Sequence, residues 1–280
     1  MNRTNYHSHC SFCDGKAPME QFVIAARDAG FTSYGVSSHA PLPFNTRWTL
    51  KLENVPAYLS ELERLKQKYA EDLELYTGME IDYLDDTQNP SIDYFQTLPL
   101  DYRIGSVHMV YTPAGKIVDT DTNLDNFKRI LEDDFQGDLQ LLVETYFRSS
   151  MRMVELGGFD FVGHADKMVH NAELCDKSLL QQGWFKRRLE DYFLLIAEKG
   201  FMAEINTKAY RVKGCFFPDE RHWGMLKELG IPILVNSDAH LPELVNDCRF
   251  LALGLLKKAG FKTVRELHQG KWVDVEIAGE

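Results

Sequence analysis

The sequence predicts an α/β protein whose parallel sheet closes into a TIM-like barrel. Seven apolar runs of strand length recur along the 280 residues, and helix-like stretches follow them. No Pro/Gly/Ser-rich linker, low-complexity segment or internal repeat interrupts the chain. Consecutive β-then-α units place their strands side by side in one sheet, so a barrel formed as a single domain by residues 1–280 is the natural solution.

The expected strands share an apolar character and a length of five to nine residues. They are residues 5–9, 33–38, 74–81, 102–110, 159–164, 201–206 and 231–237. The interval 110–158 fits the pattern least well. It opens with the turn-rich VYTPAGKIVDTD, which suggests a β-hairpin, and continues in long helical patterns. We expect it to be an insertion into the barrel.

Three stretches between the strands have apolar residues at helical spacing. Gly30 and Gly200 follow the first and third stretch, where a helix commonly ends, and Asn54 and Pro56 precede the second. The apolar positions are Met19, Phe22, Val23, Ala26 and Ala29; Tyr58, Leu62, Leu65 and Tyr69; and Leu189, Phe193 and Ile196. They are read as helix faces that pack on the core.

Composition excludes several classes of protein. The chain is 44% hydrophobic and carries a formal charge of −11, which disfavours a general nucleic-acid binder. The start MNRTNYHSH has no apolar signal region and no apolar run approaches the length of a membrane span, so we expect a cytoplasmic protein. Five irregularly spaced cysteines do not suggest a disulfide framework.

Every expected strand carries, at or near its end, a side chain that can bind a metal ion or form a hydrogen bond. In a parallel barrel these carboxyl ends share one rim. Taken singly, each histidine is more often a structural residue than a ligand. Six of the nine histidines at one rim, together with acidic residues that would repel one another without a cation, favour a catalytic metal site. The residues at the rim are His7, His9, His39, Glu80, His108, His164, Asp166, Asn206, Asp238 and His240.

The segment HSHCSFCDG also contains a CxxC pair, Cys10 and Cys13. A closed structural zinc site needs four ligands, and the other three cysteines offer no matching pair. We therefore expect Cys10 and Cys13 to be loop residues beside the metal site.

These motifs resemble those of the polymerase and histidinol phosphatase (PHP) superfamily. The similar segments are HSH with a following Asp, SSHAP, GMEID, GSVHMV, GHADK, EINTKAYR and NSDAH, which run from His7 to His240. HAPLPF, EINTKAYR and the stand-alone length look most like the histidinol-phosphatase branch. The resemblance implies a distorted (β/α)7 barrel with a trinuclear metal centre at the carboxyl ends of its strands.

Carried over by position, the resemblance implies three sets of metal ligands. His7, His9, Glu80 and Asp238 would hold the first metal; Glu80 would bridge to a second, held also by His108 and His164; and Asp14, His39 and His240 would hold the third. Imidazole and carboxylate together suit two to three Zn, Fe or Mn ions. The implied chemistry is attack on a phosphate ester by a hydroxide that bridges two metals.

Several further residues are candidates for catalysis or substrate binding. Glu80 and His240 are counted as catalytic through the metals, and Asp166 is the candidate general acid, with binding of a substrate ammonium group as its alternative. Substrate-binding candidates are Arg47, Lys167, Asn206, Lys208 and Arg211, although Lys167 and Lys208 suit a solvated loop equally well. Phe44 and Trp48 lie in the loop PLPFNTRWTL, which is either a lid or packed core.

The leading hypothesis is a metal-dependent phosphomonoesterase that converts L-histidinol phosphate and water to L-histidinol and phosphate in histidine biosynthesis. Its partner would be a small phosphorylated substrate, with no nucleic acid and no membrane. One alternative keeps the metal centre and acts on nucleotides or other phosphate mono- or diesters. Another, a non-catalytic metal-binding barrel, is disfavoured because all nine putative ligands are present in the chain.

Overall fold

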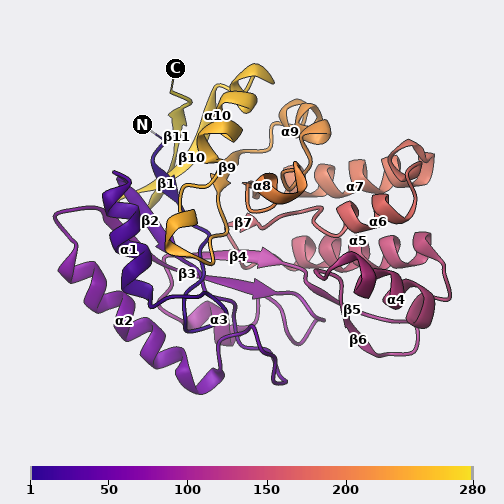
Figure 1. Cartoon of the computed structure of the whole chain (residues 1–280), viewed down its shortest axis with the longest axis horizontal. Coiled ribbons are helices and arrows are strands. Elements are labelled where there is room, and N and C mark those ends of the chain that lie inside the picture. Colours follow the sequence, from indigo (N-terminus) through magenta and orange to yellow (C-terminus); the bar gives the residue numbers. More distant parts are fainter. Residues whose placement is uncertain (1, 279–280) are drawn as a thin grey trace.

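The computed structural model describes residues 2–278, which contain a seven-stranded parallel sheet. Its strands lie in the order β1-β2-β3-β4-β7-β8-β9, so each pairs with the next sheet strand along the chain (Figure 1). All six pairings are parallel. The strands are β1 Thr4–Asn5, β2 Ser33–Val36, β3 Glu74–Asp82, β4 Tyr102–Ser106, β7 Phe161–Val162, β8 Met202–Asn206 and β9 Ile233–Asn236.

The two edges of this sheet meet just beyond β1 and β9. Ser8 and Ala239 form an isolated parallel bridge, and the amide of His9 donates to the carbonyl of Ala239 over 2.8 Å. The amide of Tyr6 donates to the side-chain oxygen of Asn236. A short contact in place of a regular ladder closes the sheet, which confirms the predicted α/β fold and its distorted, TIM-like (β/α)7 barrel.

Helices cover the outside of the sheet, with α1 and α2 on one side and α4 to α7 on the other (Figure 1). None of the helices in residues 2–278 is both long and apolar enough to span a bilayer. The helices are α1 Met19–Asp28, α2 Val55–Lys68, α3 Asp93–Thr97, α4 Leu124–Phe135, α5 Leu139–Leu156, α6 Val169–Cys175, α7 Gly183–Lys199, α8 Tyr210–Lys213, α9 Trp223–Glu228 and α10 Arg249–Lys258.

The three helices predicted from apolar spacing are α1, α2 and α7. Each buries most of the expected stripe against the barrel, as Phe22, Leu62 and Phe193 illustrate. Gly200 ends α7 in the left-handed conformation, with φ of 72°. Pro56 lies in the first turn of α2, but the side chain of Asn54 makes no capping hydrogen bond. Gly30, Gly200 and Pro56 therefore lie at the helix ends as expected, and only Asn54 does not cap its helix with its side chain.

Aromatic side chains fill the barrel at the amino-terminal ends of its strands. The Tyr102 hydroxyl donates to the backbone carbonyl of Tyr6 over 2.6 Å, and the Tyr102 ring stacks on Phe161. A Cβ atom at Gly35 or Gly78 would lie within 2.4 Å of this tyrosine. Glycine is required at both positions because the Tyr102 ring crosses directly over the neighbouring strands.

Residues 110–158 contain an antiparallel hairpin followed by two helices. The hairpin consists of β5 Met109–Tyr111 and β6 Ile117–Asp119, and α4 and α5 follow it. The single strand expected over residues 102–110 is wrong in one respect, because β4 ends at Ser106 and β5 begins at Met109. His108 lies in the break between them, which frees its side chain from the sheet.

A second antiparallel hairpin, which the sequence analysis did not anticipate, follows α10. It consists of β10 Thr263–His268 and β11 Lys271–Glu276. Leu267 and Trp272 pack against Tyr6 and Tyr102, and the indole of Trp272 donates to Asp160. The hairpin therefore closes the amino-terminal end of the barrel and leaves the other end for the polar rim.

Candidate metal centre

His7 and His9 follow β1 and are fully buried. They are two residues apart in extended backbone, so both rings point to the same side while Ser8 makes the bridge that closes the barrel. Their Nε2 atoms lie 3.2 Å and 3.4 Å from Oε2 of Glu80. The HSH motif thus places two imidazole nitrogens against one carboxylate.

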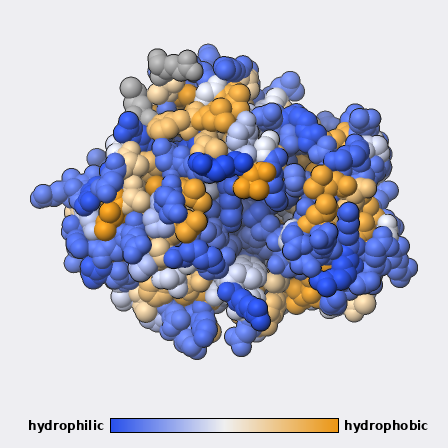
Figure 2. All heavy atoms as spheres, in the orientation of Figure 1, coloured by the Kyte–Doolittle hydropathy of each residue, from blue (hydrophilic) through white to orange (hydrophobic). Residues whose placement is uncertain are grey.

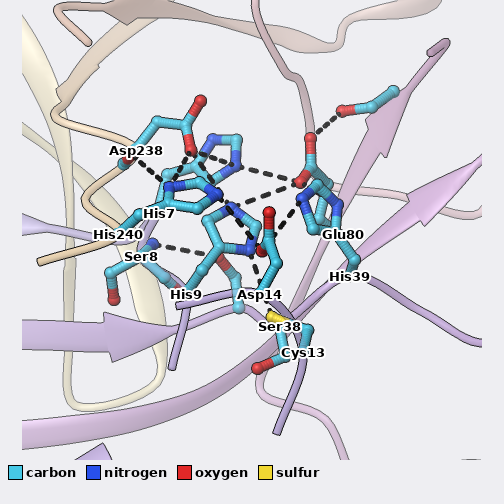
Figure 3. Close-up of polar contacts among 12 residues, drawn as sticks. His7, Ser8, His9, Cys13, Asp14, Ser38, His39, Glu80, Asp238 and His240 are labelled. Atoms are coloured by element: carbon cyan, nitrogen blue, oxygen red, sulfur yellow. Dashed lines mark hydrogen bonds and ion pairs between the residues drawn. The ribbon is translucent and has the colours of Figure 1, made fainter. Parts of the chain in front are cut away.

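Glu80 lies at the centre of the cluster and contacts five imidazole rings. Figure 3 shows Glu80 among His7, His9 and His39. Its Oε2 faces Nδ1 of His39 at 2.8 Å, while its Oε1 faces Nε2 of His164 at 2.9 Å and of His108 at 3.6 Å. Burial alone would raise the pKa of Glu80, but the surrounding imidazoles hold it well below its usual value. Glu80 is therefore a carboxylate whose two oxygens face different imidazoles: Oε2 faces His7, His9 and His39, and Oε1 faces His108 and His164.

Asp238 approaches the same centre from beyond β9. Its Oδ1 lies 3.1 Å from Nε2 of His9 and 3.2 Å from Nζ of Lys208. Burial would raise the pKa of Asp238, but Lys208 and His7 are foremost among the groups that hold it well below the usual range. A φ of 48° turns the chain here and places His240 next to the cluster as well.

Asp14, His39 and His240 form the outer part of the cluster. Oδ1 of Asp14 lies 3.2 Å from Nε2 of His240 and 3.8 Å from Nε2 of His39. The side chain of Asp14 is 25% exposed, whereas Glu80 is fully buried. Gly15 makes this turn feasible, because a Cβ there would lie 2.2 Å from the carbonyl oxygen of His9.

The donor atoms of the cluster fit divalent metal ions. Many of them are buried and have no hydrogen-bond partner among residues 2–278, a costly arrangement unless a further group lies between them. Imidazole nitrogens with carboxylate oxygens are the donor set of Zn, Fe and Mn sites. Donor atoms within 4.8 Å of one another form the groups His9, Asp14, His39 and His240; His7, His164 and Asp238; His7, His9 and Glu80; and His39, Glu80 and His108.

A polar pocket of about 190 Å³ opens beside the outer part of the cluster. Lys167 and Lys208, both substrate-binding candidates, line it. Lys167 is paired with Asp121 over 2.6 Å, and Lys208 lies 3.4 Å from Nε2 of His240. Two cations therefore face a pocket next to the cluster of candidate metal ligands. The hydrophilic face drawn in Figure 2 is hollowed near its centre.

Trp48 also lines this pocket, with its ring 4.7 Å from His39 and 5.4 Å from His108. The loop PLPFNTRWTL, predicted to be either a lid or packed core, therefore contributes Trp48 to the wall of the pocket. Phe44 lines a different surface groove, and Arg47 in the same loop is exposed and does not line the pocket. The placement of Arg47 therefore gives no support to its predicted role in binding substrate.

Two other substrate-binding candidates lie away from the pocket. Asn206 is fully buried, and its amide donates to Glu204 and Asp238, so it supports the cluster from behind. Arg211 is exposed and forms an ion pair with Asp247. Arg211 lies in α8, a helical turn after β8 that directs its side chain toward Asp247 and away from the cluster. The sequence shows that Arg211 follows a strand, but not in which direction its side chain points.

Asp166 is placed differently from the prediction of a general acid. It lines a separate small cavity beside Cys215 and Asp219, and its carboxylate accepts a hydrogen bond from the amide of Asp219 over 2.9 Å. Burial raises the pKa of Asp166 to about 8. The pKa of Asp166 suits a general acid. Its position does not, because Asp166 lines a different cavity from the pocket that contains Lys167 and Lys208.

Cys10 and Cys13 are free thiols and belong to none of the donor groups. Cys10 is buried against the hydroxyl of Ser38, and Sγ of Cys13 lies 3.6 Å from Nδ1 of His9. Both cysteines therefore lie beside the cluster, in the loop between His9 and Asp14.

Four acidic residues of the site were missed by the sequence analysis. Asp82 and Glu204 are buried behind the cluster and contact Nδ1 of His108 and His7. Asp119 and Asp121 line the pocket at the end of the β5–β6 hairpin, and burial raises the pKa of Asp119 to about 6. Asp82 could have been found from its spacing, because it points to the same side of β3 as Glu80.

Curated relatives share moderate identity with this chain over most of its length. A probable histidinol-phosphatase of Deinococcus radiodurans is 26% identical over 267 residues, which covers 94% of this chain and 96% of the relative. A histidinol-phosphatase of Bacillus subtilis is 27% identical over 258 residues, covering 86% and 94%.

A solved structure is similar over nearly the whole fold. The histidinol phosphate phosphatase of Lactococcus lactis, complexed with zinc, L-histidinol and phosphate, is 21% identical and superposes with a TM-score of 0.70 over 96% of this chain and 98% of its own. The profile of the PHP domain matches residues 5–208, which include seven of the nine ligands expected from the sequence. The chain therefore belongs to the PHP domain family.

Proposed function

We propose that this protein is a metal-dependent phosphomonoesterase that hydrolyses L-histidinol phosphate to L-histidinol and phosphate. The observation that carries the proposal is the convergence of six imidazoles and three carboxylates, one of them Glu80, beside a pocket lined by two lysines. Membership of the PHP domain family and similarity to histidinol-phosphatases over most of the chain support the same activity.

The proposed ligand sets are those that the resemblance to the PHP superfamily implies. His7, His9, Glu80 and Asp238 would hold one metal; Glu80, His108 and His164 a second; and Asp14, His39 and His240 a third. Donor atoms of His7, His9 and Glu80 lie within 4.8 Å of one another, as do those of Asp14, His39 and His240, which supports part of this division. His7 also groups with His164 and Asp238, and His39 with Glu80 and His108. Zn, Fe or Mn ions in these positions would lower the pKa of water and neutralise charge on phosphoryl oxygens.

The chain's own cations complete a site for a phosphate group. Nζ of Lys208 lies 3.2 Å from Oδ1 of Asp238 and reaches the pocket beside His240. Lys167 lies 4.0 Å from Oδ2 of Asp238 and is held by Asp121. We infer that these two ammonium groups orient the phosphate, as point charges that accept several approach directions.

The remaining walls of the pocket favour a small, positively charged leaving group. Asp119 and Asp121 place two carboxyl groups on one wall, which would repel the additional phosphates of a nucleotide. The indole of Trp48 offers an aromatic surface beside His39. An amino alcohol with an aromatic ring, such as L-histidinol, has the positive charge and the flat aromatic group that these walls would accept.

A panel of phosphate-release assays tests the proposal. The zinc-loaded protein should be offered L-histidinol phosphate, nucleoside monophosphates, sugar phosphates and a phosphodiester under identical conditions. We expect the highest kcat/KM for L-histidinol phosphate. Preference for a nucleotide or a diester would instead indicate a PHP-type phosphoesterase with another substrate, and release from none of them would contradict the phosphatase assignment.

A further inference from the structure

Glu204 is a fully buried carboxylate on β8, directly behind the cluster. Its Oε1 lies 2.8 Å from Nδ1 of His7, and its Oε2 accepts a hydrogen bond from the backbone amide of His164 over 3.0 Å. The same Oε2 accepts the side-chain amide of Asn206, which also donates to Asp238. One carboxylate is therefore bonded to residues of β8 and to the segments that follow β1 and β7.

The contact with His7 determines which ring nitrogen is free. A neutral imidazole carries one proton, and a carboxylate at Nδ1 retains that proton on Nδ1. Nε2 of His7 then presents a lone pair toward Glu80, where it has no hydrogen-bond partner among residues 2–278. Metal-binding histidines commonly use such a carboxylate to fix the tautomer and orient the ring.

The contact with His164 fixes a second putative ligand through its backbone. His164 has a φ of 27°, a conformation that L residues rarely adopt, and the Glu204 hydrogen bond holds its amide in that turn. Nε2 of His164 lies 2.9 Å from Oε1 of Glu80, whereas His7 faces Oε2. Glu204 therefore supports ligands on both oxygens of the bridging Glu80.

We propose that Glu204 is the positioning residue that sets His7 and His164 together, so that two metal sites depend on one buried carboxylate. The inference rests on the proposed function insofar as that function assigns His7 and His164 to metals. Asp82 provides a comparison, because its Oδ1 contacts Nδ1 and the backbone amide of His108 alone. Loss of Asp82 should weaken one site, and loss of Glu204 should weaken two.

Glu204→Gln is the most informative change, because it retains size but removes one acceptor. If the new NH2 group faces Nδ1 of His7, it can only donate a hydrogen bond. The proton of His7 must then move to Nε2, and the lone pair of Nε2 is no longer free to bind a metal. If the NH2 group instead replaces Oε2, it faces the backbone N–H of His164 and the side-chain NH2 of Asn206, which are also donors. Either orientation disturbs a ligand, and outer partners of metal ligands typically contribute 10- to 100-fold to metal affinity.

A matched control is Glu266→Gln. Glu266 is also buried, and it also contacts a histidine and an asparagine, His268 and Asn2, but it lies on β10 outside the metal centre. The measurement is zinc affinity and zinc per chain in metal-buffered dialysis, without substrate, with the melting temperature of the metal-free protein recorded in parallel. We expect Glu204→Gln to lose at least about tenfold in affinity at two sites, Asp82→Asn at one, and Glu266→Gln at none.

Unchanged zinc affinity and stoichiometry in Glu204→Gln would overturn the inference, whatever the phosphatase activity proves to be. If that variant does not fold, ¹⁵N NMR of histidine-labelled wild-type protein tests the same point with zinc bound. We expect the proton of His7 on Nδ1, and a proton on Nε2 would contradict the positioning role. Because neither measurement uses substrate, their failure is distinct from failure to hydrolyse L-histidinol phosphate.

Discussion

Oε2 of Glu80 and Nδ1 of His39 lie only 2.8 Å apart, yet neither atom forms a hydrogen bond within residues 2–278. A buried carboxylate oxygen and a ring nitrogen held this close without a hydrogen bond are stabilised when a cation lies near both. Glu80 lies on β3 and His39 follows β2, and the two residues also form a backbone bridge. The strand pairing that builds the barrel therefore also builds the most crowded part of the metal centre.

Replacing Glu80 with Gln should abolish most activity while the fold is retained. The change removes the negative charge that faces all five imidazoles around Glu80. We therefore expect kcat to fall by more than the roughly 10- to 100-fold loss that is typical when a hydrogen-bond partner of a metal ligand is replaced. Circular dichroism establishes folding, and metal content per chain establishes the cause. An unchanged kcat would remove Glu80 from the site.

Asp14→Asn should affect only the outer part of the cluster. Asp14 contacts His39 and His240 and does not contact Glu80 directly, so metals held around Glu80 should remain. We expect the variant to lose one metal equivalent relative to the wild type, measured by mass spectrometry after dialysis. Loss of all metals together would show that the cluster does not divide as proposed.

Lys208→Ala should weaken phosphate binding, and Arg211→Ala should serve as its control. Lys208 lines the pocket, whereas Arg211 is paired with Asp247 on the surface. Loss of one charged contact to phosphate should raise KM by about tenfold, equivalent to roughly 1.4 kcal/mol. A raised KM in Arg211→Ala with a normal value in Lys208→Ala would reverse this assignment.

Asp166→Asn tests both the position and the titration of Asp166. Because the residue lines a cavity apart from the lysine-lined pocket, kcat should be largely retained; a loss of several orders of magnitude would restore the general-acid role.

The pKa of Asp166 also makes a prediction for stability. Since burial raises the folded-state pKa to about 8, the folded protein binds the proton more tightly than the unfolded chain. The contribution of Asp166 to stability is therefore greatest at low pH and is lost as pH rises toward 8. The free energy of unfolding, measured with denaturant, should fall less steeply with pH in Asp166→Asn than in the wild type between the usual aspartate pKa and about 8. The same slope in the variant and the wild type would contradict the raised pKa.

The sequence predicted the barrel because strand-length runs and helical periods survive in local patterns. It predicted the convergence of side chains such as those of His7 and Asp238 because parallel strands bring their carboxyl ends to one rim. It placed Arg211 and Asp166 less well, because the direction of a side chain after a strand depends on the loop that follows. Glu204 was missed because a carboxylate within an apolar strand looks the same whether it faces solvent or a buried imidazole.

The C-terminal hairpin shows a further limit of local patterns. Residues 263–276 pack against the barrel through Leu267 and Trp272, which meet strand residues far away in the chain. No periodicity within the segment indicates that partner. Long-range packing of this kind has to be seen in the structure.

The central claim is that this cluster uses bound metal ions to hydrolyse a phosphate ester. The most direct test is phosphate release from L-histidinol phosphate by one preparation as purified, after exhaustive chelation, and after zinc, iron or manganese is restored. We expect activity that disappears with the metals and returns with at least one of them. Full activity in protein shown to be free of metal would contradict it.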